Sequence, residues 1–369
     1  MASNIMKDVM LKMLVACALL KAVFPLQNSN IIDMSENNIT IVRDGMFSNH
    51  THLEYLDLSK NKISEILSEA FSGLESLKTL NLEGNDLKIL KTGIFSNLIS
   101  LWYIHLQENE ISGIESSAFS GLLSLHVLNL QKNKISVLKN GRFKNLASLT
   151  ILNLYDNGIL EIEPEAFFGL QALEMLQLRG NKLKILKSGI FSNLNSLKRL
   201  ILNNNEISVI ESDVFSDLQS LDRLVLFSNK LTNVTQRVFG NLSSLYKIDL
   251  SHNKIYMIEL GSFSDLKYCD SLYLSQNKLT KLYSGMFSGM SLLRNLLLTF
   301  NQITDVESGA FVGLKSLEYL FLDRNNLSKI PTDVCEHLPK LNYLSIISNN
   351  MTGGPSEYTS SNEIRELCL

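Results

Sequence analysis

Cysteine is scarce in this chain of 369 residues, and several chemical signatures are missing with it. The four cysteines never fall in a Cys-x-x-Cys pair, so neither a structural zinc site nor a thiol redox motif is supported. No apolar run approaches the ~18 residues that a membrane-spanning helix needs. The net charge of −3 gives no sign of binding to nucleic acid or to an anionic membrane.

Motifs of catalysis are missing as well. The sequence has no Gly-x-Gly-x-x-Gly, P-loop or Gly-x-Ser-x-Gly motif. The best candidate for a metal or acid–base site is His105 with His126 and the nearby Glu108, but no third ligand or nucleophile accompanies them. We therefore expect a protein that is not an enzyme and that carries no cofactor or metal.

The dominant feature that is present is an asparagine every 24 residues, without insertion or deletion. The fourteen positions are Asn37, Asn61, Asn85, Asn109, Asn133, Asn157, Asn181, Asn205, Asn229, Asn253, Asn277, Asn301, Asn325 and Asn349. A phenylalanine follows ten residues after each of the first twelve, from Phe47 to Phe311, and the thirteenth slot holds Cys335 instead. Such a fixed period indicates a solenoid in which each repeat forms one coil.

The spacing within each repeat predicts how a coil is built. Leu56 and Leu58 alternate as in a strand, so both side chains point into the core while residues 55 and 57 point out. Asn61 carries a donor and an acceptor, and we expect it to satisfy backbone groups of its own coil and of the next. Phe71 and Leu74 fill the outer side of the coil. The Ser- and Gly-rich convex side predicts 3₁₀ turns and irregular chain.

The frame L-x-x-L-x-L-x-x-N-x-L, written here as Leu53-x-x-Leu56-x-Leu58-x-x-Asn61-x-Ile63, resembles the "typical" 24-residue class of extracellular leucine-rich repeats. Toll-like receptor, Slit, chondroadherin and glycoprotein-hormone and relaxin receptor ectodomains look similar. The resemblance covers residues 29–352 and implies an α/β horseshoe with a parallel sheet on its concave face. It also implies protein recognition, adhesion or ligand capture outside the cell.

The two ends of the chain lie outside this repeat domain. Residues 1–28 form a candidate signal peptide, with Lys7 and Lys12 before the short apolar run Met13–Leu20, or else an uncleaved cover of the first coil. Residues 353–369 form a linker and a partial fifteenth repeat, whose strand at residues 364–369 would keep Cys368 too far from Cys335 for a disulfide.

The sequence also contains six sequons for N-linked glycosylation, which have a meaning only if the chain is secreted. They lie at Asn38, Asn49, Asn233, Asn241, Asn326 and Asn350.

A second period of 48 residues underlies the first. The sixth position after the repeated asparagine alternates in sign, from Lys91 and Glu115 to Lys187 and Glu211. Because consecutive members lie one coil apart, about 5 Å, we expect a ladder of exposed ion pairs on the flank. We interpret this column as structural rather than as a ligand site.

Binding residues are expected on the concave face, where the composition changes between the two halves of the chain. The fifth position of the frame is polar in the first half and becomes largely apolar or aromatic in the second. The residues predicted to contact a partner protein are Trp102, Tyr103, Arg199, Arg223, Phe227, Lys247, Tyr273, Leu297, Phe300, Tyr319, Phe321 and Tyr343. Two alternatives stay open: the composition of the face drifts without function, and Arg199, Arg223 and Lys247 form salt bridges to Glu174, Asp222 and Asp249.

The sequence therefore predicts a non-catalytic protein that binds another protein with its concave face, outside the cell. The rival hypotheses are an intracellular scaffold and the ligand-binding fragment of a transmembrane receptor.

Overall fold

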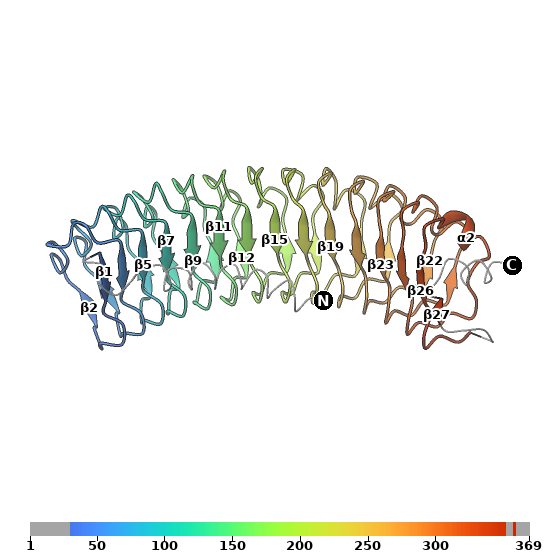
Figure 1. Cartoon of the computed structure of the whole chain (residues 1–369), viewed down its shortest axis with the longest axis horizontal. Helices are drawn as coiled ribbons and strands as arrows, with labels where there is room; N and C mark the ends of the chain where they lie inside the picture. Colours follow the sequence, from blue (N-terminus) through green and yellow to red (C-terminus); the bar gives the residue numbers. More distant parts are fainter. Residues whose placement is uncertain (1–29, 352–356, 359–369) are drawn as a thin grey trace.

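The described residues form one curved solenoid, as the repeat predicts (Figure 1). The computed structural model describes residues 30–351 and 357–358. The candidate signal peptide at residues 1–28 and the proposed strand at residues 364–369 lie outside this range, as does any pairing of Cys368.

The inner side of the solenoid is a single sheet of fifteen strands that follow one another in chain order. Neighbouring strands are in register at the repeat length, with Leu56 opposite Leu80. The parallel strands are β1 (Ile31–Asp33), β3 (Tyr55–Asp57), β5 (Thr79–Asn81), β7 (Tyr103–His105), β9 (Val127–Asn129), β11 (Ile151–Asn153), β13 (Met175–Gln177), β15 (Arg199–Ile201), β17 (Arg223–Val225), β19 (Lys247–Asp249), β21 (Ser271–Tyr273), β23 (Asn295–Leu297), β25 (Tyr319–Phe321) and β26 (Tyr343–Ser345).

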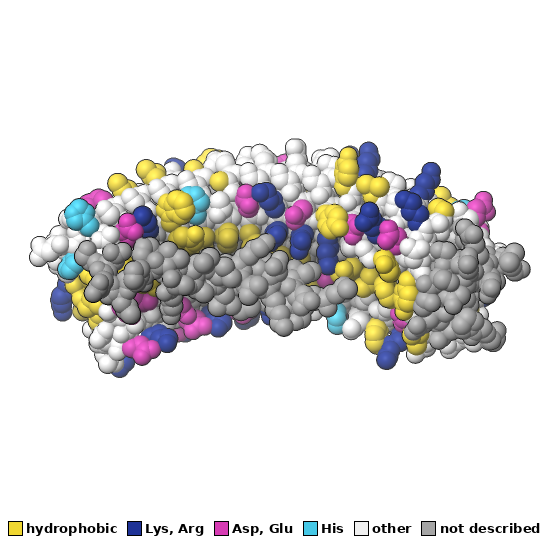
Figure 2. Space-filling view, viewed as in Figure 1, with side chains coloured by type: hydrophobic (Ala, Val, Ile, Leu, Met, Phe, Trp, Pro, Cys, Tyr) yellow, Lys and Arg dark blue, Asp and Glu magenta, His cyan; other side chains and the backbone are white. Residues whose placement is uncertain are grey.

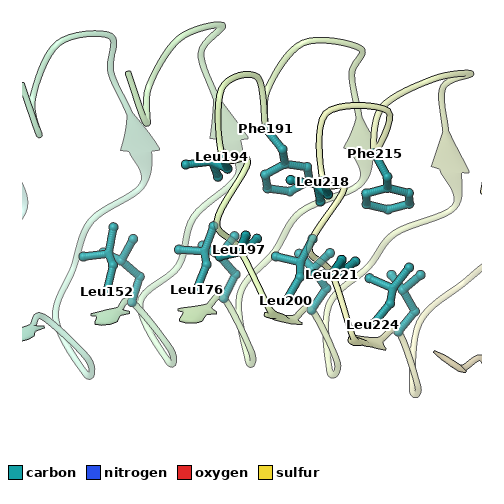
Figure 3. Close-up of a cluster of buried hydrophobic side chains, with 14 of the residues drawn as sticks. Leu152, Leu176, Phe191, Leu194, Leu197, Leu200, Phe215, Leu218, Leu221 and Leu224 are labelled. Atoms are coloured by element: carbon teal, nitrogen blue, oxygen red, sulfur yellow. The ribbon is translucent and has the colours of Figure 1, made fainter. Parts of the chain in front are cut away.

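The core lies between this sheet and a file of phenylalanines on the outer side. Figure 3 shows Leu200 and Leu224 stacked at the strands, with Phe191 and Phe215 at the opposite wall of the core. All four side chains are fully buried. Neighbouring phenylalanine rings lie 6.0–6.5 Å apart along the file, whereas parallel strands lie about 4.8 Å apart. The wider outer spacing makes the solenoid curve with the sheet on its inner side.

The repeated asparagines lie in the turn after each strand and bridge two coils. The Asn181 carboxamide accepts N–H bonds from Gly158 and Ile159, at 3.0 Å each. Its amide group donates to the carbonyls of Leu154, at 3.1 Å, and of Leu178, at 2.9 Å. The prediction that Asn serves its own coil and the next was therefore wrong in direction. The side chain projects toward the preceding turn, so three of these four partners lie on the preceding coil.

The 48-residue period appears as pairs of coils along the flank. Short strands there pair in twos only, in six separate two-stranded sheets. The pairs are β2 (Ile41–Val42) with β4 (Glu65–Ile66), β6 (Ile89–Leu90) with β8 (Gly113–Ile114), β10 (Val137–Leu138) with β12 (Glu161–Ile162), β14 (Ile185–Leu186) with β16 (Val209–Ile210), β18 (Asn233–Val234) with β20 (Met257–Ile258), and β22 (Lys281–Leu282) with β24 (Asp305–Val306).

The alternating charges do not pair with one another as predicted. Within the coil pairs, Glu115 accepts the backbone N–H of Thr92 at 2.8 Å, and Glu211 accepts that of Ser188 at 2.8 Å. The lysines instead form ion pairs with glutamates of the neighbouring coil pair. Lys187, for example, pairs with Glu161 at 2.9 Å. A carboxylate gains more from a fixed backbone donor one coil away than from an exposed ammonium, which water solvates well.

The convex side consists of short turns. Hydrogen bonds such as Ala70 N–H to the Leu67 carbonyl, at 3.2 Å, close them over three residues in place of continuous helix. In the described ranges the one helix is α2 (Val334–His337), which occupies the slot where the phenylalanine file stops. Its four residues fall far short of a bilayer span, and no helix in those ranges is long and apolar enough to cross a membrane.

A buried cysteine and the last strand complete the described part of the solenoid. Cys269 takes a leucine slot of the repeat and is fully buried, and this burial raises the pKa of its thiol to about 12. After β26 comes β27 (Glu357–Tyr358), which pairs antiparallel with it. Because β27 lies along that edge of β26, the place expected for a parallel fifteenth strand is taken by residues predicted to be a linker.

These assignments rank three substitutions by stability. Asn181→Ala should lower the free energy of unfolding by about 1–3 kcal/mol, because it leaves buried backbone groups unpaired. Phe191→Ala should cost about 3–5 kcal/mol through the cavity it opens in the outer wall. Lys187→Ala should cost less than either, because its ion pair is exposed to water. Urea unfolding of the three variants measures the order, and a larger loss for Lys187 than for Phe191 would contradict it.

Candidate functional site

The outward side chains of the strands and of the turns after them form the candidate binding surface. Alternation along each strand sends the middle residue into the core and leaves its two neighbours on the sheet face. Strand register then places predicted residues side by side. Arg199, Arg223 and Lys247 form one row across β15, β17 and β19. A second row crosses the next three strands, β21, β23 and β25: Tyr273, Leu297 and Phe321.

The cationic row keeps most of its charge available. Of the three expected salt bridges one forms, from Arg223 Nε to Asp222 at 3.9 Å. Glu174 pairs instead with Lys198, at 2.7 Å, and Asp249 accepts the backbone N–H of Ser251 at 3.0 Å. Figure 2 shows Lys and Arg side chains gathered near the middle of the solenoid. The row therefore presents an open positive field to a partner.

Lys247 joins the cationic row to the aromatic one. Its ammonium donates to the Tyr273 hydroxyl at 3.0 Å and lies 4.2 Å from the ring centroid. Such a cation–π contact holds the ring against the sheet. The two rows are consequently one continuous surface from β15 to β25, rather than two separate patches.

The aromatic end of this surface is partly packed and partly exposed. The rings of Phe321 and Tyr343 lie 5.2 Å apart with their planes tilted by 46°. Tyr319 stands in register with Tyr343 and is exposed. Phe321 is half-buried, so its ring offers one face to solvent while its other contacts fix its position. Preorganised aromatic side chains of this kind are typical of binding hot spots.

Phe300 occupies a backbone position that disfavours a bulky residue. The residue before the repeated asparagine has a positive φ in every described coil, and at Phe300 the angle is 56°. Aromatic residues are rare in this left-handed region, where Gly and Asn are at ease. Its ring is 46% exposed and lies 4.7 Å from the guanidinium of Arg324, which follows one repeat later. Sequence reasoning missed Arg324, although its spacing from Phe300 was a usable signal.

The aromatics of the first half stand apart from this surface. Trp102, whose side chain is 48% exposed, stacks on the ring of His126 at 4.6 Å and lies 6.5 Å from Tyr103. These residues belong to the coils of β7 and β9, whereas Phe227 follows β17 in the second half. The structure therefore divides the twelve predicted residues into one C-terminal surface and a separate pair at Trp102 and Tyr103.

The histidines of the candidate metal or acid–base site, and the glutamate near them, each have another partner in the structure. His105 is held by the Asn129 carboxamide at 3.1 Å, and burial lowers its pKa and favours the neutral ring. His126 bonds through Nδ1 to the Ser124 carbonyl at 2.7 Å, while Glu108 pairs with Lys132 at 2.6 Å. Across residues 30–351 no group of three His, Cys, Asp or Glu side chains is arranged to hold a metal ion.

The six sequons differ in accessibility. Five of their asparagines are exposed: Asn38, Asn49, Asn241, Asn326 and Asn350. Asn233 lies in β18 and is half-buried, and its side chain accepts a bond from the Thr232 hydroxyl at 3.2 Å. Asn233 is thus the least accessible site for a glycan.

Comparison with known proteins gives a family and several relatives in fold. A leucine rich repeat family model matches ten overlapping stretches between residues 28 and 351. A leucine-rich repeat protein of Leptospira interrogans is 26% identical, with a TM-score of 0.70 over 91% of this chain and 81% of the other. No curated protein sequence matches at a significant level.

Two receptor complexes share the fold. Toll, in the Toll–Spatzle complex of Drosophila, is 22% identical with a TM-score of 0.81, over 88% of this chain and 45% of Toll. The plant peptide hormone receptor RGFR1, in complex with RGF2, is 23% identical with a TM-score of 0.58, over 87% and 55%. This chain therefore spans about half the length of those two receptor chains.

The strained backbone at Phe300 gives a stability prediction. Phe300→Asn should leave the free energy of unfolding unchanged or raise it by about 1 kcal/mol, because Asn tolerates the left-handed conformation. The contact with Arg324 that is lost is exposed, so it offsets little of this gain. Urea unfolding measures the effect, with Leu298→Asn, at a buried position of the same coil, as a control that should destabilise. A clear loss of stability in Phe300→Asn would mean that the ring packs as part of the core.

Proposed function

Because the chain belongs to the leucine-rich repeat family, we propose that it recognises another protein through the sheet face of its C-terminal half. The surface runs from the cationic row Arg199, Arg223 and Lys247 to the aromatic end at Phe321 and Tyr343. Leucine-rich repeat solenoids commonly serve protein recognition. Toll and RGFR1, which share this fold, are described in complexes with Spatzle and RGF2.

The observation that carries the proposal is the uninterrupted join between charge and aromatic surface at Lys247 and Tyr273. A drift in composition would scatter apolar side chains over the face, yet here Tyr273, Leu297 and Phe321 follow in register over three neighbouring strands, and Tyr319 is in register with Tyr343. Exposed apolar side chains beside open positive charge suit a partner segment that combines acidic and apolar residues. The exposed and strained Phe300 supports the same surface, since backbone strain persists where function retains it.

We also propose that this recognition is non-catalytic and takes place outside the cell. The support for an extracellular site is the resemblance to extracellular repeat proteins and the exposure of five sequon asparagines. An intracellular scaffold and a fragment of a transmembrane receptor are the competing proposals. The proposed binding surface is the same whether the chain is extracellular, an intracellular scaffold or a receptor fragment.

A paired substitution tests the binding surface. Replacing Tyr273 and Phe321 by Ser should weaken binding of the partner by a few kcal/mol, as for other hot spots. Quantitative comparison of proteins retained by the immobilised chain identifies the partner, and calorimetry with that purified partner gives the affinities. Tyr256→Ser is the matched control, because this exposed tyrosine lies outside the sheet strands. Equal binding by both variants would rule out the proposed surface.

A glycosylation assay tests the location. Expression in a secreting eukaryotic cell should release the chain into the medium, with a gel shift on enzymatic deglycosylation. Asn241→Gln and Asn326→Gln should each reduce that shift, because both side chains are exposed. Asn233→Gln should change it least. A chain that stays in the cytosol and shows no shift would favour the intracellular scaffold.

A further inference from the structure

The first half of the sheet face holds buried amide oxygens without a well-placed donor. Gln107 Oε1, Asn129 Oδ1 and Asn153 Oδ1 make no hydrogen bond of normal geometry to the described residues, although the His105 ring interacts with the Gln107 side chain. Their side chains are 8%, 7% and 1% exposed. Asn129 ends β9, Asn153 ends β11 and Gln107 follows β7, and these strands lie side by side (Figure 1). A fourth such oxygen, on Gln131, follows β9.

Outward positions do not need these residue types for folding. The core and the asparagine turns are complete without them. In other coils Ser or Thr fills the positions equivalent to Gln107 and Gln131, and Ile, Val or Leu fills those equivalent to Asn129 and Asn153. A buried acceptor without a donor costs free energy and is uncommon in native proteins. Four on neighbouring coils therefore point to a ligand that brings its own donors.

The excess of acceptors has a local cause. Carboxylates and a histidine on the N-terminal side take up the amide N–H donors. Asn81 donates to Asp57 at 3.0 Å, and Gln107 donates to Glu83 at 2.6 Å. Asn129 lies 3.1 Å from the ring nitrogen of His105. The oxygens of Gln107 and Asn129 are left without such a partner, because no amide N–H of the following coil forms a hydrogen bond to them.

We propose that this amide cluster, Gln107, Asn129, Gln131 and Asn153, binds an arginine side chain of a partner polypeptide. A guanidinium carries five N–H donors in one plane and no acceptor, so it can serve several oxygens at once. Amides on successive strands, about 4.8 Å apart, offer such a set of acceptors.

Charge and aromatic surface favour the same occupant. Asp57, Glu83 and Asp156 make no ion pair among residues 30–351, whereas the nearby Lys132 is neutralised by Glu108. The first half of the face is therefore net negative, opposite in sign to the cationic row at β15–β19. Tyr103, two residues before His105 on the same face of β7, supplies an aromatic ring on which a guanidinium can stack. His105 stays neutral because burial lowers its pKa, so it does not repel a cation.

Calorimetry with a short probe tests this site. The probe is the peptide acetyl-Gly-Arg-Gly-Arg-Gly-amide, compared with the same peptide carrying citrulline, which is similar in shape but neutral. We expect the arginine peptide to bind at least tenfold more tightly. Asn129→Leu and Asn153→Leu should each weaken it about tenfold. Gln177→Leu, in the same row but without an unpaired buried oxygen, should not change it.

Further variants distinguish an effect on binding from an effect on folding, and the amide cluster from the C-terminal surface. Asn153→Leu should keep or raise the melting temperature, because it removes an unpaired acceptor. Asn153→Asp should tighten binding of the arginine peptide severalfold, and Phe321→Ser should leave it unchanged because that ring belongs to the C-terminal surface. Equal affinity for arginine and citrulline peptides, no gain in Asn153→Asp, or equal loss in Gln177→Leu would overturn the proposal. Free arginine binding as tightly as the peptide would overturn a polypeptide as the source.

Discussion

The asparagine bridge between coils is the constraint on which the rest of the structure depends. From Asn61 to Asn349, each carboxamide accepts at least one backbone N–H of the preceding coil and donates to a carbonyl of that coil and to one of its own, as at Asn85 and Asn181. A residue added or lost between the strand and its asparagine, as between Leu178 and Asn181, would move the side chain out of reach of these groups. The constant place of the asparagine after each strand is thus a geometric requirement, because the bridge fixes the register between strands. Every surface feature inherits that register.

The phenylalanine file sets the curvature of the solenoid, and the flank joins its coils in pairs. Aromatic rings hold neighbouring coils further apart outside than the strands do inside, so the sheet lies on the inner side of the curve. On the flank, short strands bind coils into pairs, and the glutamates of the second coil accept backbone N–H groups of the first. Ion pairs such as that of Lys91 with Glu65, at 3.0 Å, join one coil pair to the next. The two-repeat unit is therefore visible in the bonding as well as in the sequence.

Sequence reasoning succeeded where a residue's partners are fixed by the period. The strands, the leucine core, the buried Cys269 and the rows of the sheet face follow from counting in repeats. It failed where two chemically sensible partners compete within one coil spacing: the bridging asparagines serve the preceding coil, and Glu115 prefers the Thr92 amide to Lys91. The sign pattern alone cannot decide between an ammonium and a backbone donor. It also missed Arg324 and the unpaired amide oxygens, because these depend on side-chain orientation rather than on residue type.

The two proposed surfaces set a condition on the partner. Asn153 and Leu297 stand on strands six coils apart, or about 29 Å at the strand spacing. An extended polypeptide covers that distance in roughly nine residues. A partner with a basic segment at one end and an acidic, apolar segment at the other could occupy both surfaces only in one direction along the sheet. Because the scaffold is rigid, the second contact would then form within one molecule and at high effective concentration. The opposite charge of the two halves thereby provides specificity that neither surface has alone, since a reversed partner would place like charges together.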